Sequence, residues 1–351
     1  MVLAMSLLLI PVAEAQTNWP ERTSFDGDFR LRYESIDAEG SPYRDRSRLR
    51  ARLGIDVLAA EDIKFVFRLA TGDGSPVSTN LTLDGGFSAK DILVDRAYVD
   101  WRLSEQWTLH GGKIKSPWFR AGGSSLIWDA DLNPEGVAAH FRSGSFFASL
   151  AALPVEERSS ADDSLLLTAQ GGWKIALAEN ASLTTGLGYY SYTNAAGSAP
   201  FYDGHAAGNS VDLAGNYLND YRLIEAYAEY KTVVGEIPLT AYLDVVRNNA
   251  VSVEDTGYAI GANLGSANAP GKAEFGYAWQ DTEADAVVGT YNDSDFAGGV
   301  TDARGHFIKA KYAIRDNVKL GGTLILARRG AFAGNERDYD RIMIDLEFGF
   351  E

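Results

Sequence analysis

The chain has 351 residues, a formal net charge of −16, 36 glycines and no cysteine. The absence of cysteine excludes a disulfide framework and a thiolate metal site, and the acidic balance argues against a nucleic-acid partner. No stretch reaches the roughly 18 consecutive apolar residues that a membrane-spanning helix needs, which excludes a helical membrane protein as well.

Residues 1–15, the first element of the chain, predict a secretory signal peptide. Residues 2–12 form an apolar core, and Ala13-Glu14-Ala15 has the small-x-small pattern of a cleavage site, so the mature chain would begin at Gln16. The positive residues that usually precede the apolar core are missing, and a buried N-terminal helix is the alternative. Residues 16–351 are predicted to form a single domain, because no linker or internal repeat divides them.

Two segments that follow, 24–34 and 46–57, alternate strictly between apolar and polar positions. The first places Phe25, Phe29 and Leu31 on one face and Arg30 and Arg32 on the other. The second carries four arginines on a single face, namely Arg46, Arg48, Arg50 and Arg52. Such alternation is typical of β-strands. Unpaired charge is expensive in a soluble core, whereas a transmembrane β-barrel has an outside that meets lipid and an inside that meets water.

Alternating segments continue to the end of the chain. They lie at 63–69, 97–101, 107–109, 137–141, 146–150, 165–173, 183–189, 224–230, 239–245, 258–264, 273–279, 308–312, 320–326 and 342–350. Short connections alternate with long ones rich in Gly, Asp and Asn, the longest at 72–88, 116–135, 194–219 and 282–304. Together these features predict an all-β fold, a transmembrane antiparallel β-barrel of about 16 strands with short periplasmic turns and long external loops.

Several motifs add a family resemblance. The runs FDGDFRLRYE (25–34), RSRLRARLG (46–54) and WDADLNPEG (128–136) resemble the proteobacterial "putative porin" family. The resemblance implies a passive channel in the Gram-negative outer membrane, neither an enzyme nor dependent on a cofactor. Its partners would be outer-membrane lipid and lipopolysaccharide, together with small hydrophilic solutes or ions. The permeating solute stays open, as does assembly into a homotrimer.

The connection 116–135 lies between the fifth and sixth predicted strands, where general porins fold a loop into the lumen. Its acids Asp129, Asp131 and Glu135 are predicted to form a constriction loop opposite a basic wall, because fixed charges at close quarters select ions. The predicted pore-lining residues of that wall are Arg30, Arg32, Arg46, Arg48, Arg50, Arg52, Arg68 and Arg96. Alternatively, these arginines pair with acids on neighbouring inner strands. That explanation suits any single arginine, but the six on the first two strands exceed the local acids.

Two other functions remain as alternatives. A solute-specific porin would use the planar guanidinium groups to bind phosphate or carboxylate groups. A barrel hydrolase would use Ser124 or Ser125 near His140, but no G-x-S-x-G or H-E-x-x-H pattern occurs, so no catalytic residue is predicted. The Gly-Asp run at 71–74 lacks the EF-hand spacing, so no metal site is predicted either.

Overall fold

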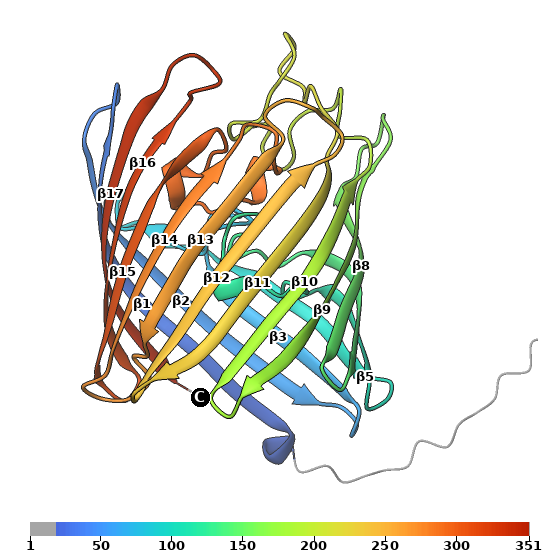
Figure 1. Cartoon of the computed structure of the whole chain (residues 1–351), viewed down its shortest axis with the longest axis vertical. Coiled ribbons are helices and arrows are strands. Elements are labelled where there is room, and N and C mark those ends of the chain that lie inside the picture. Colours follow the sequence, from blue (N-terminus) through green and yellow to red (C-terminus); the bar gives the residue numbers. More distant parts are fainter. Residues whose placement is uncertain (1–18, 351) are drawn as a thin grey trace, which may run out of the picture.

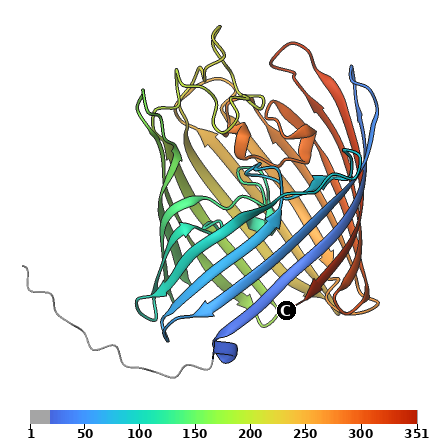
Figure 2. The same ribbon diagram turned by 180° about the vertical axis from the view of Figure 1, so that it is seen from behind.

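The computed structural model describes residues 19–350, and the predicted signal peptide lies outside them. The strands form one closed antiparallel barrel, in which β1 pairs with β2 on one side and with β17 on the other. Sixteen strands of the described chain complete the ring, and the two-residue β4 pairs with β2 beside them. Figures 1 and 2 show this barrel from opposite sides. The predicted fold class is confirmed.

The strand bounds are β1 (Thr23–Ala38), β2 (Arg44–Leu58), β3 (Ile63–Thr71), β4 (Leu81–Thr82), β5 (Ile92–Arg102), β6 (Trp107–Lys113), β7 (Glu135–Ser143), β8 (Phe146–Glu156), β9 (Ser164–Ala178), β10 (Ala181–Tyr192), β11 (Arg222–Val234), β12 (Ile237–Asn248), β13 (Thr256–Gly265), β14 (Ala273–Thr282), β15 (Ala303–Arg315), β16 (Val318–Arg329) and β17 (Arg337–Phe350). Four short 3-10 helices accompany them, namely η1 (Trp19–Arg22), η2 (Ala121–Gly123), η3 (Gly289–Tyr291) and η4 (Phe296–Gly298). None of the helices in residues 19–350 is long and apolar enough to cross a membrane.

The two faces of the strands differ in the way the alternation predicts. On β1, Phe29 and Leu31 keep about 40% of their surface exposed, whereas Arg30 and Arg32 between them are buried at 8% and 6%. Exposed apolar side chains recur on the outer face around the ring, from Leu53 on β2 to Phe350 on β17. The outside of the barrel is therefore apolar and its charged groups lie inside, as a protein surrounded by lipid requires.

The connections divide by length between the two ends of the barrel. Short turns lie at the end that holds η1 and the C-terminal end of β17, and long connections lie at the opposite end (Figure 1). Two of the long connections, 114–134 and 283–302, fold into the barrel, where Trp118, Leu126, Trp128 and Val287 share one buried cluster. The sequence predicted an inward fold only for the first of them.

Candidate functional site: a charged constriction

Two glycines mark the points where the inward loop 114–134 leaves and rejoins the wall. Gly112 on β6 and Gly136 on β7 face each other in the register and have φ angles of +128° and +131°. A Cβ atom on Gly136 would lie 2.4 Å from the carbonyl oxygen of Ala152, so a larger residue does not fit there. Because L side chains rarely adopt this conformation, glycine is required on both sides of the loop.

The loop 114–134 is fastened to the wall formed by β9 and β11. The indole N–H of Trp118 donates to Thr168 at 3.2 Å, the amide of Phe119 donates to Gln170 at 2.8 Å, and the amide of Gly122 donates to Glu229 at 2.8 Å. Trp118 also stacks on Trp128 with ring centroids 4.0 Å apart. These contacts hold the loop against one side of the barrel and leave its acidic end directed at the other side.

The arginines of β1 and β2, called the arginine ladder below, face that acidic end from the opposite wall. In the register, Arg30 lies opposite Arg50, and Arg32 lies opposite Arg48. Like charges directly across a sheet are destabilising, so carboxylates must intervene. Asp28 pairs with Arg50 at 2.7 Å and with Arg52 at 2.6 Å.

Two further wall carboxylates come from the barrel seam. Glu34 is fully buried and pairs with Arg46 and with Arg341 of β17. Asp345 of β17 pairs with Arg32 at 2.7 Å. Pairing between wall charges therefore accounts for much of the ladder, which is the alternative that the sequence also offered.

The three predicted loop acids lie in different places. Asp131 reaches the ladder and pairs with Arg52 at 3.2 Å. Asp129 is buried and accepts hydrogen bonds from the amides of Asp131 and Ser294, so it joins the two inward loops without touching the ladder. Glu135 differs from the expectation, because it is the first residue of β7 and pairs with Lys113 on β6 at 3.1 Å.

A carboxylate from the second inward loop, 283–302, lies against the ladder as well. Asp295 pairs with Arg32 at 3.0 Å and with Arg341 at 2.8 Å. Burial would raise the pKa of Asp295, but the guanidinium groups of Arg341 and Arg32 hold it below its ordinary value. Asp295 is not among the predicted site residues, although the apolar run at 286–288 in an otherwise polar connection is a signal that this loop is buried.

Three arginines have an amide where the others have a carboxylate. Arg30 donates to the side-chain oxygen of Asn80 at 2.6 Å, and Arg48 donates to the backbone oxygen of the same residue at 2.9 Å. Their nearest carboxylates are 3.9 and 3.8 Å away. Arg96 donates to Asn133 at 2.8 Å, whereas neighbouring Arg68 pairs with Asp95. Arg30 and Arg48 are therefore held by Asn80 and share Asp345 and Glu34, at longer distance, with other arginines, and Arg96 forms no ion pair among residues 19–350.

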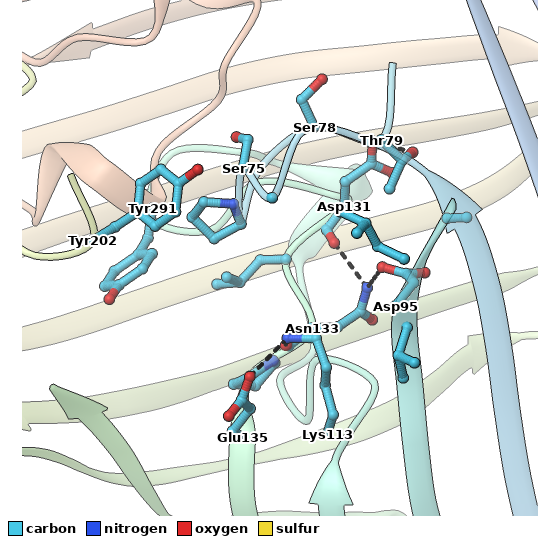
Figure 3. Close-up of a pocket in the computed structure, with 18 of the residues that line it drawn as sticks. Ser75, Ser78, Thr79, Asp95, Lys113, Asp131, Asn133, Glu135, Tyr202 and Tyr291 are labelled. Atoms are coloured by element: carbon cyan, nitrogen blue, oxygen red, sulfur yellow. Dashed lines mark hydrogen bonds and ion pairs between the residues drawn. The ribbon is translucent and has the colours of Figure 1, made fainter. Parts of the chain in front are cut away.

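Beside the constriction, at the end with the long connections, a cavity of about 320 Å³ opens between the loops. Figure 3 shows Asp131, Asn133 and Asp95 meeting on one side of it and Tyr202 and Tyr291 on the other. Of the three predicted loop acids, Asp131 and Glu135 line this cavity and Asp129 does not. Within residues 19–350, no group of three or more His, Cys, Asp or Glu side chains is arranged to hold a metal ion.

The residues that a hydrolase would have needed are not brought together. The hydroxyl nearest to His140 is that of Ser149, at 2.9 Å from the ring Nδ1 atom. Ser124 and Ser125 line a different cavity, together with Tyr242 and Asp293. Ser149 itself is buried, with 8% of its surface exposed.

Comparisons with known proteins agree with the geometry. A family model described as "Putative porin" matches residues 39–210 and 205–350. No curated protein matches the sequence. The structure is similar to Pseudomonas putida OprB at high pH, with a TM-score of 0.62, 11% identity and coverage of 94% of this chain and 95% of that one. It is also similar to a triple mutant of the Rhodopseudomonas blastica porin, with a TM-score of 0.55, 13% identity and coverage of 93% and 100%. At such low identity these structures establish the fold alone.

Proposed function

Because this chain belongs to the "putative porin" family, we propose that it forms a water-filled channel in the Gram-negative outer membrane. Small hydrophilic solutes and ions would diffuse through it passively, without catalysis. The proposal is supported by the charged interior, where arginines of the wall face carboxylates of two inward loops. A low-dielectric wall focuses the field of such charges into the water between them.

The balance of charge at the constriction favours anions. We define the arginine wall as the eight predicted arginines together with Arg341. Six carboxylates are in ion-pair contact with these nine arginines, namely Asp28, Glu34, Asp95, Asp131, Asp295 and Asp345. The excess of three positive charges corresponds to Arg30, Arg48 and Arg96, which are bound by amides. The channel is therefore proposed to be weakly anion-selective.

A single substitution tests this proposal in planar bilayers with a salt gradient. Asn80→Asp keeps the oxygen that accepts from Arg30 but adds a negative charge between Arg30 and Arg48, so the reversal potential should shift toward cations. The shift should shrink at 1 M salt, where the Debye length is only about 3 Å. Arg328→Gln is the matched control, because it changes the charge by the same amount on an exposed arginine that pairs with Asp338.

The outcomes separate the parts of the proposal. If the purified protein gives no discrete conductance, the channel function is wrong. If it conducts, but Asn80→Asp and Arg328→Gln behave alike at low salt, the narrow point lies away from the arginine wall. Selectivity for one anionic solute is the second candidate, because Arg30 and Arg48 each keep a buried Nε atom without a hydrogen-bond partner. In that case phosphate would block the current at saturating concentration, and Asn80→Asp would remove the block.

One strand of the barrel, β6, is shorter than a transmembrane strand usually is. Strand β6 has 7 residues, whereas a transmembrane strand needs about 9–11. Small residues, Gly111 and Ala139, make the outer surface there concave. We propose that this wall packs against another copy of the chain in a homotrimer. Native mass spectrometry should show trimers that Gly111→Trp dissociates, and a monomeric wild-type protein would refute the assembly without affecting the channel proposal.

A further inference from the structure

A row of four polar side chains crosses the inner wall of β5, β6, β7 and β8, away from the constriction. Asp100 and His110 flank the short turn between β5 and β6, and His140 and Ser149 flank the one between β7 and β8. All four occupy inward-facing positions near the end of the barrel with the short turns. The proposed channel function makes no use of them.

The two imidazole rings meet at the centre of this row. Nδ1 of His110 lies 3.2 Å from Nε2 of His140. The outer nitrogen of each ring has its own neighbour, since Nδ1 of His140 lies 2.9 Å from the hydroxyl of Ser149 and Nε2 of His110 lies 3.7 Å from a carboxylate oxygen of Asp100. Both rings are carried by neighbouring strands of the barrel wall, because β6 pairs with β7 and β7 pairs with β8. The wall therefore holds the two rings in fixed positions.

The neighbours determine where the ring protons lie. The carboxylate of Asp100 favours the proton on Nε2 of His110, which leaves a lone pair on Nδ1 directed at His140. Without a metal, His140 donates from Nε2 to that lone pair, and Ser149 donates to Nδ1 of His140. If the proton of His140 moves to Nδ1 instead, it can be donated to the Ser149 oxygen. Both facing nitrogens then present lone pairs to the space between them, and no proton has left the pair.

We propose that this His110–His140 pair binds a divalent transition-metal ion, Cu²⁺, Ni²⁺ or Zn²⁺. Two neighbouring imidazole nitrogens at about 2.0–2.1 Å from one ion are about 3.3 Å apart in a tetrahedral site and about 2.9 Å apart in a tetragonal one, and the two facing nitrogens already lie 3.2 Å apart. Ser149 supplies the outer hydrogen bond of His140, and the carboxylate of Asp100, 3.7 Å from Nε2 of His110, favours the proton on that nitrogen through its charge. Water from the lumen completes the coordination, which is consistent with the lack of a third protein ligand within the described residues.

The charged groups around the His110–His140 pair allow a cation to bind there. Asp100 is the nearest carboxylate, and it shares Lys64 with Asp56, at 3.9 Å from Lys64 compared with 2.8 Å for Asp56. Arg142, two residues after His140, is the other nearby cation. Because affinity for nitrogen ligands rises from Ni²⁺ to Cu²⁺ and falls again at Zn²⁺, copper should bind most tightly.

The test is a Cu²⁺ titration of the folded full-length protein in detergent, prepared without a histidine tag. One Cu²⁺ per chain should bind, with nitrogen couplings from two imidazoles in the electron paramagnetic resonance spectrum. His110→Gln and His140→Gln should each lower the affinity at least tenfold, and Asp100→Asn should lower it less than either, because it removes only the charge beside Nε2 of His110. His205→Gln, in the external loop between β10 and β11, is the matched control and should bind as the wild type does.

The same experiment can refute the site. Absence of Cu²⁺ binding to the wild type, a spectrum without two-nitrogen coupling, or unchanged affinity in His140→Gln would each overturn the proposal. Heat-dependent migration in gels shows whether each variant is folded, and if His110→Gln does not fold, His140→Gln carries the same test. Ion selectivity is measured separately at the arginine wall, so failure of either proposal leaves the other standing.

Discussion

The ion pairs of Asp295 should hold the loop 283–302 inside the barrel. Its carboxylate contacts Arg32 at 3.0 Å and Arg341 at 2.8 Å, and both arginines are almost fully buried. Two unit charges about 4 Å apart attract by about 4 kcal/mol at an effective dielectric constant of about 20. Removing one partner of a buried pair destabilises by about 3–5 kcal/mol, because the other charge stays buried.

The expected effect of Asp295→Asn is smaller than these upper values. The Asp295 side chain keeps 26% of its surface exposed, and Arg32 retains Asp345 as a second partner. We therefore expect a loss of about 2–3 kcal/mol for the loop contact, which corresponds to a roughly 30- to 150-fold increase in the open fraction. Phe296 remains as an apolar anchor, buried against Phe307, so the loop should open transiently and stay folded on average.

Hydrogen exchange of the folded protein in detergent measures this opening directly. Amides of residues 283–302 should lose protection by the factor given above in Asp295→Asn, while the barrel strands keep theirs. Single-channel records should show more frequent fluctuations between conductance levels. Asp293→Asn is the matched control, because among residues 19–350 Asp293 forms no ion pair with an arginine, and its Oδ1 accepts from the amides of Asp295 and Phe296, as the amide oxygen of asparagine also can. Equal hydrogen exchange in the two variants would refute the role of Asp295 in holding the loop.

Two other predictions concern the lipid face and the contact between the loops. Leu243→Arg on the outer face should destabilise the barrel by about 2–4 kcal/mol, whereas Thr240→Arg on the inner face of the same strand should destabilise it by less than about 1 kcal/mol. Reversible unfolding in lipid measures both free energies. Equal penalties would contradict the assigned faces. Burial is the main cause that raises the pKa of Asp129 well above its ordinary value, and the charges of Asp293 and Asp131 raise it further. The contribution of Asp129 to stability is therefore present at low pH and is lost as the pH rises through its folded-state pKa. Melting temperatures across a pH series should fall less steeply in Asp129→Asn, and an identical slope would show that Asp129 does not titrate in this range.

The barrel was predictable because its signals are local and repeated. Alternation with a period of two assigns a face to every residue of a strand, and the alternation of connection lengths then assigns the ends of the barrel. One long-range pairing also follows from closure, since the last strand must meet the first. On that basis, the sequence alone could have placed the inward-facing Asp345 beside Arg32. These two residues are partners in the register of β1 and β17.

The loop contacts could not be predicted in the same way. The connections have no periodicity, and Asp295 meets a residue that is 263 positions away in the chain. Asp129 and Asp131 look equivalent in sequence, but the carboxylate of Asp129 accepts from the amides of Asp131 and Ser294, whereas the carboxylate of Asp131 pairs with Arg52. Glu135 was grouped with them because it is acidic, although pairing of β6 with β7 places it beside Lys113.

The choice of amide or carboxylate partners decides the electrostatics of the constriction. An arginine in the wall needs an acceptor to stay in one conformation, and either group supplies one. A carboxylate also neutralises the arginine, whereas Asn80 and Asn133 fix Arg30, Arg48 and Arg96 without adding a negative charge. Asn80 reaches its position because β4 pairs with β2, so that Thr82 lies opposite Arg48. Under the proposed function, this two-residue strand, which carries no alternation that a sequence could display, would help to set the sign of the field in the channel.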